Sequence, residues 1–273
     1  GLGDVYKRQN MYVGNLSYNV KESDLRQVME EYGVVESVKL ITDRETRRSK
    51  GFAFVEMPES SEASNAIKEL NGAVDIGVRV EVRDEVMEFL NDNLYEAKLV
   101  YHTPTFDDKV RTFCTNPSGE VATEYYDNGL AVVNGHAYKS KDLKTNNTNF
   151  AILVSKNFTK PFKTPIEYGK QIAQLSNMLC DGKILVQTFG DFRRGRRTTE
   201  ERLCRNNLIP TLKDAVPGDL SLVFPHRIMV DIEEMILALD KVTPGIASDE
   251  TLLYGVEAVS YTHLRAHETP EHL

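Results

Sequence analysis

The chain has 273 residues, of which 41% are hydrophobic and 27% are charged, and its formal net charge is −8. The apolar fraction excludes a disordered chain, and the sequence has no apolar run of about 18 residues that could cross a bilayer as a helix. The negative charge argues against a protein that coats duplex DNA by bulk electrostatics, although it leaves room for one that binds single strands by stacking. The length fits one large domain or two domains of ordinary size.

The cysteine usage indicates a reducing compartment and no metal site. Cys114, Cys180 and Cys204 lie far apart and form no C-x-x-C pair, which supports neither a disulfide framework nor a structural zinc site. Residues 1–9 have no apolar core of the kind that a signal peptide needs. We therefore expect a cytoplasmic protein without a metal.

The two ends of the chain lack the periodicity of a helix or a strand. Residues 1–9 read GLGDVYKRQ, and residues 258–273 end in YTHLRAHETPEHL. Both resemble the translated sequencing adapters found at the ends of proteins from metagenomic assemblies, and ordinary frayed termini are the alternative. We expect adapter-like tails without regular structure, which removes His263, His267 and His272 from any metal argument.

Residues 10–83 follow the order strand, helix, strand, strand, helix, strand. The expected helices begin at Ser23 and near Ser60, and the expected strands cover residues 11–14, 35–42, 51–57 and 78–82. In the last of these strands, three valines alternate with Arg79 and Glu81, which is typical of a half-buried strand. Two such halves predict an α+β ferredoxin-like βαββαβ sandwich, with four antiparallel strands, both helices on one face and the other face open.

Residues 84–257 have a different sequence pattern, which predicts an α/β segment. Strand-like runs at 98–101, 130–133, 150–154 and 220–224 alternate with helical stretches at 86–90, 168–179, 199–208 and 229–239. This part contains no G-x-G-x-x-G, G-x-x-x-x-G-K-[ST], G-x-S-x-G or H-E-x-x-H motif. His136, Cys114 and the arginine-rich loop 193–197 are interpreted as structural or solvated features.

Aromatic residues occupy alternating positions on two expected strands of the first domain. The first strand and its following turn read MYVGNL at 11–16, and the third strand reads KGFAFVEM at 50–57. Because strand side chains alternate between faces, Tyr12, Phe52 and Phe54 gather on the open face when their small apolar neighbours pack beneath the helices. Exposed ring faces form a platform for unstacked bases. The alternative is a sheet covered on both faces, in which the same rings belong to a core.

Basic and polar residues around these rings complete the expected site. Residues 10–83 hold ten Lys and Arg against thirteen Asp and Glu, so we expect modest affinity that depends on stacking, with steering from the loop Arg44–Lys50. The further candidate contacts are Lys50, Lys39, Arg48, Arg47, Asn15 and Arg79.

The two aromatic segments resemble the RNP2 and RNP1 motifs of the RNA recognition motif (RRM) family, at the separation and in the strands which that family uses. The resemblance covers residues 10 to about 73. Within the family, this part is most similar to small bacterial RNA-binding proteins with one such domain. It implies that Tyr12, Phe52 and Phe54 stack on single-stranded RNA, without catalysis. The sequence departs from the motif at Ala53, where Gly is common, and at Met57, where an aromatic residue is usual.

Residues from about 74 to 257 resemble an internal segment of a bacterial family of FAD-dependent dehydrogenases. The resemblance rests on VRVEV at 78–82, NGHAYK at 134–139 and QTFGDF at 187–192, among other runs. In that family, the glycine loop for the dinucleotide lies upstream and a closing flavin segment lies downstream, and this sequence has neither. The resemblance therefore implies no bound cofactor and no turnover, and an FAD-dependent oxidoreductase fragment is the alternative function.

The resemblance changes from the first family to the second at residues 72–74, just before the expected last strand of the first domain. Domains are usually joined through an exposed linker rather than inside a folded unit, so the junction predicts a chimera of two unrelated genes. A true fusion is the alternative, and a third interpretation makes the second part an inert partner-binding domain. The expected limits are 1–9 for the first tail, 10–83 for the RRM, 84–257 for the dehydrogenase-like segment and 258–273 for the second tail.

Overall fold

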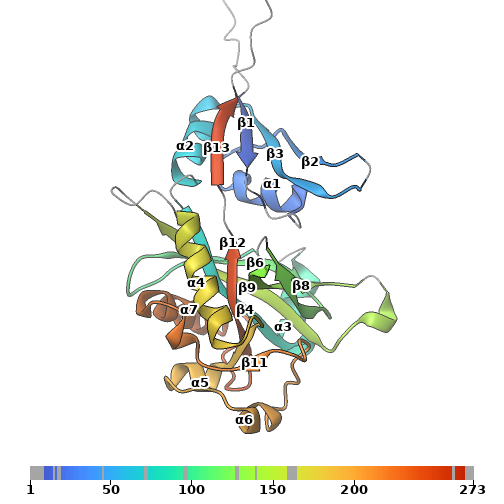
Figure 1. The fold of residues 1–273 in the computed structure, drawn as a ribbon, viewed down its shortest axis with the longest axis vertical. Coiled ribbons are helices and arrows are strands. Elements are labelled where there is room, and N and C mark those ends of the chain that lie inside the picture. The colour runs from blue at the N-terminus through green and yellow to red at the C-terminus, as the bar shows by residue number, and fades with distance from the viewer. Residues whose placement is uncertain are drawn as a thin grey trace, which may run out of the picture. The chain divides into compact units, whose positions relative to one another are not determined.

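The computed structural model describes residues 9–14, 16, 20–44, 46–70, 73–94, 98–126, 129–138, 140–158, 165–259 and 262–267. The chain divides into two compact units (Figure 1). The small unit comprises residues 1–74, 157–166 and 260–273, and the large unit comprises residues 75–156 and 167–259.

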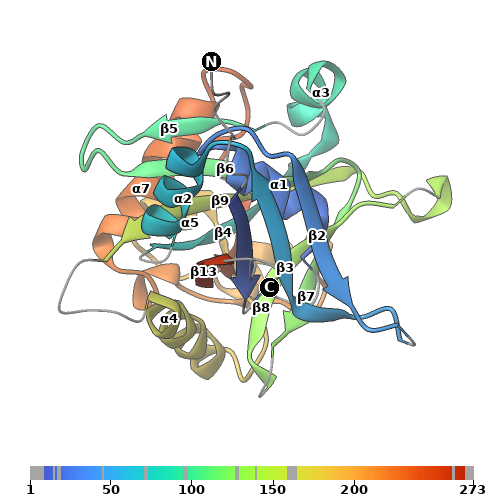
Figure 2. The same ribbon diagram turned by 90° about the horizontal axis from the view of Figure 1, so that it is seen from above.

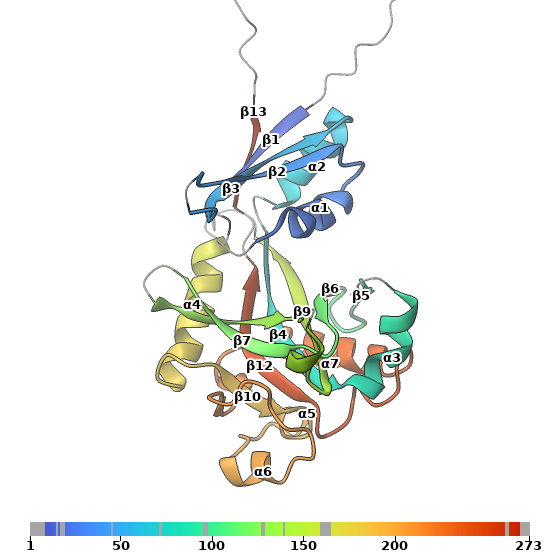
Figure 3. The same ribbon diagram turned by 90° about the vertical axis from the view of Figure 1, so that its right-hand side faces the viewer.

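The small unit is a four-stranded sheet in the order β13-β1-β3-β2, with both helices on one side of it (Figure 3). All three strand pairs are antiparallel. This architecture confirms the predicted α+β sandwich. Its elements are β1 (Gln9–Gly14), α1 (Glu22–Glu30), β2 (Ser37–Thr42), β3 (Ser49–Met57), α2 (Ser60–Leu70) and β13 (Thr262–His267).

The helices of the small unit cover one face of its sheet because their apolar positions recur every three or four residues. Helix α1 begins after Lys21, whose backbone N–H donates to Oδ2 of Asp24 at 2.9 Å, and it buries Leu25 and Met29 completely. Helix α1 contacts β2, whereas α2 contacts β1, β3 and β13. The strand residues of the covered face, Met11, Val13, Ala53 and Val55, are all 0% exposed.

The predicted fourth strand of the small sheet is wrong. Residues 78–82 belong to β4 (Ala73–Arg83), which lies between β12 and β9 in the sheet of the large unit. Arg79 and Glu81 are as fully buried as the valines between them, so the alternation of charge and valine does not mark a solvent face here. The first compact unit includes the chain up to Val74.

The second tail also differs from its prediction, because residues 262–267 form a strand. Strand β13 pairs antiparallel with β1 and occupies the position expected for residues 78–82. Main-chain hydrogen bonds hold such a pair whatever the side-chain pattern, which explains why periodicity did not reveal it.

The large unit is built on a seven-stranded sheet in the order β11-β10-β12-β4-β9-β6-β5, beside a separate hairpin of β7 and β8. Its remaining elements are α3 (Asp84–Asn93), β5 (Val100–His102), β6 (Lys109–Asn116), β7 (Glu120–Tyr125), β8 (Ala131–His136), η2 (Lys141–Leu143), β9 (Asn147–Asn157), α4 (Pro165–Leu179), β10 (Leu185–Thr188), α5 (Phe189–Arg193), α6 (Glu200–Cys204), β11 (Val216–Pro217), η3 (Leu220–Leu222), α7 (His226–Leu239) and β12 (Leu252–Val259). The run 220–224, expected as a strand, holds the 3-10 helix η3 instead, because the carboxylate of Asp219 accepts from the N–H of Ser221 at 2.9 Å and starts the turn.

Buried ion pairs hold the centre of the large sheet. The guanidinium of Arg79 donates from Nε and Nη2 to the two carboxylate oxygens of Glu257 at 2.7 and 2.6 Å. Its Nη1 donates to Oδ1 of Asn149 at 2.9 Å. Burial raises the pKa of Glu257, and the charge of Arg79 opposes that rise. Arg79 is thus a structural residue of this sheet.

Candidate nucleic-acid interface

Three aromatic rings lie together on the helix-free face of the small sheet. Tyr12 on β1 is the register partner of Phe54 on β3, and Phe52 lies two positions before Phe54 on the same strand. The ring centroids are 5.6 Å apart for Tyr12 and Phe52, 5.9 Å for Tyr12 and Phe54, and 6.2 Å for Phe52 and Phe54. In Figure 2 the three strands β1, β3 and β2 are the blue arrows that lie side by side.

The burial of neighbouring residues separates the two faces of these strands. Ala53 and Val55 are 0% exposed. Phe52 and Phe54, which alternate with them along β3, are partly exposed, and so is Tyr12 on β1. The tilted and edge-to-face contacts among the rings account for part of their burial. The rings therefore form an aromatic patch at the surface of the small unit, and they are not sealed beneath its helices.

The predicted basic residues lie on β2, in the β2–β3 loop and at the start of β3, the strand that carries Phe52 and Phe54. Lys39 is exposed and is the register partner of Phe54, which places it on the same face. The Lys50 side chain is 51% exposed, with Nζ 4.0 Å from Oδ2 of Asp43. Arg47 and Arg48 are exposed in the loop. Asn15 lies outside the described residues.

The expectation that Arg79 lies beside these rings is wrong. Arg79 is 0% exposed, lies on β4 of the other sheet and pairs with Glu257. A phosphate cannot reach this guanidinium, because the side chain is fully buried and its Nε, Nη1 and Nη2 groups already donate to protein acceptors. The error follows from the misplaced fourth strand and not from the choice of residue type.

Two further positions of this face were missed from the sequence. Ile41 is the register partner of Phe52 and extends the apolar area beside it. Glu56 shares a row with Ser37, whose hydroxyl donates to Oε2 of Glu56 at 2.7 Å. The alternation of Ser37, Lys39 and Ile41 along β2 could have revealed this row, since register partners share a face. The carboxylate gives one end of the patch a negative charge, opposite to the basic loop.

Two helix starts in the described part of the large unit, those of α3 and α5, do not fit the pyrophosphate of a flavin dinucleotide. Such a group needs free N–H donors at a glycine turn before a helix. In the first turn of α5, the N–H groups of Phe189, Gly190 and Asp191 already donate to Thr251, Asp249 and Thr188. Helix α3 begins with Asp84 and Glu85, whose charge repels a phosphate. The turn between β9 and α4 includes residues outside the described part.

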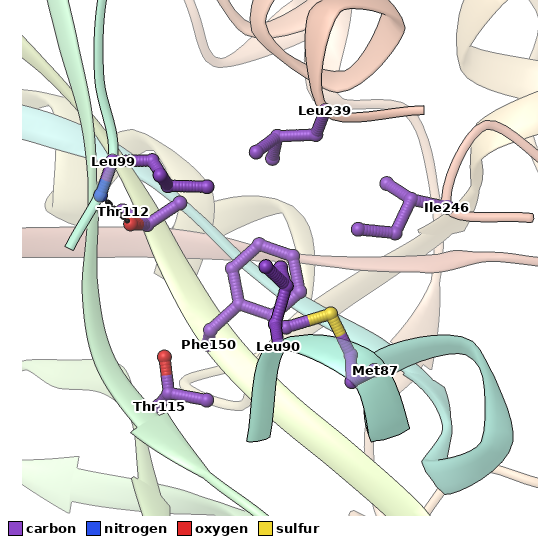
Figure 4. Close-up of a pocket in the computed structure, with 8 residues that line it drawn as sticks. All are labelled: Met87, Leu90, Leu99, Thr112, Thr115, Phe150, Leu239 and Ile246. Carbon is purple, nitrogen blue, oxygen red and sulfur yellow. Dashed lines mark hydrogen bonds between the residues drawn. The ribbon is translucent and has the colours of Figure 1, made fainter. Parts of the chain in front are cut away.

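A hollow in the large unit does not fit a flavin either. Its empty space is only about 190 Å³ even when the open solvent at its mouth is counted, which is too little for a flavin dinucleotide. Figure 4 shows its mainly apolar lining, which has two threonines and no charged group, so nothing there would pair with a phosphate. The lining residues are Met87, Leu90, Leu99, Thr112, Thr115, Phe150, Leu239 and Ile246.

The described ranges contain neither a membrane-spanning helix nor a metal cluster. No helix there is long and apolar enough to cross a membrane. The same residues contain no group of three or more His, Cys, Asp and Glu that could hold a metal ion.

Comparison with known proteins gives two matches along the chain. Residues 11–80 match the family model described as RNA recognition motif, and residues 73–260 match the one described as FAD-dependent protein, C-terminal domain-like. The segment 73–80, in β4, is thus shared by both matches.

The similar proteins and solved structures align with the part of the chain that matches the RNA recognition motif. The Nostoc sp. protein RbpD, whose name provisionally describes it as RNA-binding, is 53% identical over 72 residues, which are 26% of this chain and 77% of that protein. RbpA of Synechocystis sp., named in the same provisional way, is 51% identical over 73 residues, covering 27% of this chain and 72% of that protein. A crystal structure titled RNA Binding Protein PG1 is 53% identical and has a TM-score of 0.23, covering 23% of this chain and 77% of that one.

Proposed function

This chain belongs to the FAD-dependent protein, C-terminal domain-like family and carries an RNA recognition motif ahead of that domain, and we propose that it binds single-stranded RNA on the aromatic patch of the small unit. The observation that supports the proposal most directly is the cluster of Tyr12, Phe52 and Phe54 on a helix-free sheet face. Two relatives that are about half identical to this part of the chain are described as RNA-binding proteins.

In the proposed complex, unstacked bases lie on the rings and the phosphates lie toward the basic loop. Stacking of a base on an aromatic side chain contributes about 1–3 kcal/mol and tolerates any base. Lys39 beside Phe54 and the exposed Arg47, Arg48 and Lys50 supply the positive charge. Glu56 at the opposite end of the patch disfavours a phosphate there. The RNA backbone therefore runs with its phosphates nearer to β2 and its loop.

The proposal is tested by titrating the full chain with a fluorescent single-stranded RNA oligomer and with the matching duplex. We expect binding of the single strand and much weaker binding of the duplex, because the bases of a duplex cannot lie on the rings. Equal affinity for both forms, or no binding of the single strand, contradicts the proposal.

A salt titration separates the basic loop from the rings. Replacing Arg47 and Arg48 by alanine is expected to lower the slope of log K against log salt by about 0.7 for each phosphate that the loop no longer binds. The matched control is the pair Arg193→Ala at the end of α5 and Arg197→Ala in the loop after it, both exposed on the large unit, which should leave the slope unchanged. A slope that is insensitive to the first pair of substitutions removes the loop from the proposed interface.

An FAD-dependent oxidoreductase fragment is the second candidate function, favoured by the family match over residues 73–260. The occupied donors at the start of α5 and the acidic residues at the start of α3 argue against flavin binding at those places, so we expect no cofactor and no turnover. The purified protein should be colourless and should stay so after incubation with FAD and desalting. A yellow preparation with flavin absorption bands would establish the second candidate.

A further inference from the structure

A carboxylate lies on the aromatic face of β3, two positions beyond Phe54. Glu56 shares this face with Phe54, because side chains two positions apart on a strand lie on the same side. Val55 and Met57, which alternate with them, are 0% exposed on the covered side, whereas the Glu56 side chain is partly exposed. A carboxylate repels phosphate, so the RNA group that suits this position is one that donates hydrogen bonds.

Ser37 on β2 orients this carboxylate. Ser37 is the register partner of Glu56, and its hydroxyl donates to Oε2 of Glu56 at 2.7 Å. Among the described side chains, Ser37 is the one donor to the carboxylate, and Oε1 has no partner there. Because each carboxylate oxygen has two lone pairs, Oε2 also keeps capacity for a further donor. Glu56 thus presents two adjacent acceptors beside the aromatic patch.

Guanine is the RNA base whose edge fits two adjacent acceptors. Its Watson–Crick edge carries the N1–H and N2–H₂ donors side by side. Adenine and cytosine each place one amino donor beside a ring nitrogen that accepts, and uracil has a single N–H between two carbonyl oxygens. An ionised carboxylate can only accept hydrogen bonds. It therefore pairs through both oxygens with guanine and is repelled by the acceptors of the other three bases.

From this complementarity we propose that Glu56 is a specificity-determining residue, which selects guanine for the base that stacks on Phe54. The inference rests on the proposed function of the aromatic patch. Positions two apart on a strand are separated by about 6.6 Å, so a base on the Phe54 ring directs one edge toward Glu56. Stacking itself tolerates any base, and the preference comes from the edge. Ser37 is a positioning residue, because it acts through the carboxylate.

The test titrates the full chain with uridine oligomers that differ at one central position, which holds guanine, adenine, cytosine or uracil. We expect the guanine oligomer to bind about tenfold more tightly than the uracil oligomer, within the range for a side chain that contacts a base through two hydrogen bonds. Glu56→Gln replaces one acceptor by an amino donor, and one donor beside one acceptor fits adenine and cytosine. This variant should therefore shift the preference from guanine to those two bases.

Three further variants separate the contact from the loss of charge. Glu59→Gln removes the same charge from an exposed position of the small unit, just after β3, and should leave the ratios of the four affinities unchanged. Ser37→Ala should reduce the ratio of guanine to uracil affinity and leave the affinity for the uracil oligomer unchanged. Ser37→Thr keeps the hydroxyl and should retain the ratio.

The outcomes distinguish this inference from the proposal on which it rests. Equal affinities for the four oligomers, alongside weakened binding by variants of the rings, overturn the role of Glu56 and leave the aromatic patch in place. A guanine preference that persists in Glu56→Gln, or that Glu59→Gln also removes, likewise overturns the contact. Failure of the unaltered chain to bind any of the oligomers overturns both proposals together.

Discussion

Replacing Phe52 and Phe54 together by alanine is expected to reduce the affinity for single-stranded RNA by several kcal/mol, because each base stack on an aromatic side chain contributes roughly 1–3 kcal/mol. Both rings are partly exposed and lie on the helix-free face, so their removal leaves the covered face with Ala53 and Val55 intact. The measurement is a filter-binding or anisotropy titration against one oligomer at fixed salt.

The control for the ring variants is an aromatic residue outside the small unit. Phe89 on α3 is 64% exposed, and Phe89→Ala should leave RNA affinity unchanged. Tyr12→Phe keeps the ring on β1 and is expected to retain most of the binding, whereas Tyr12→Ala removes one stack. Unchanged affinity of the Phe52 and Phe54 double variant for single-stranded RNA would contradict the stacking model.

Replacing Arg79 by alanine is expected to destabilise the large unit by about 3–5 kcal/mol, the usual effect of removing one partner of a buried ion pair. The substitution leaves the carboxylate of Glu257 buried without its bidentate partner. RNA affinity measured under native conditions should not change, since Arg79 lies in the large sheet. Urea unfolding followed by circular dichroism measures the decrease in stability.

Arg83, on the same strand, is the matched control for Arg79. Its side chain is 44% exposed and pairs with Glu85 at 3.5 Å and with Glu250 at 3.4 Å. Exposed pairs contribute only about 0–1 kcal/mol, so Arg83→Ala should have a small effect on the free energy of unfolding. If Arg79→Ala weakened RNA binding with no decrease in stability, the assignment of β4 to the large sheet would be contradicted.

The sequence was sufficient for the part of the fold that is encoded locally. Alternation along β1 and β3 predicted which side of each strand carries Tyr12, Phe52 and Phe54, and the apolar spacing of Leu25 and Met29 predicted α1. The register of Lys39 with Phe54 places that lysine on the same face. These features depend on neighbours in the chain, which is why one sequence reveals them.

The fourth strand could not be predicted because its partners are distant in sequence. Arg79 and Glu81 look like solvent-facing residues until Glu257 and Tyr254, from β12, are brought beside them. The alternation along β4 looks the same whether Arg79 is exposed or is paired with Glu257, which lies 178 positions further along the chain. The prediction that two unrelated genes meet near residue 73 stays open, and one long unassembled DNA read across codons 70–80 would decide it.

The position of β13 in the sequence also determines when the sheet of the small unit can be completed during synthesis. Residues 9–70 leave the ribosome early, but the strand that covers the free edge of β1 is made only at 262–267. Until then, the nascent sheet presents unpaired main-chain groups that invite pairing with other chains. Contacts of such long sequence separation also form slowly. The four-stranded sheet is therefore completed late in translation, and a chain that is truncated within the large unit keeps an open sheet edge.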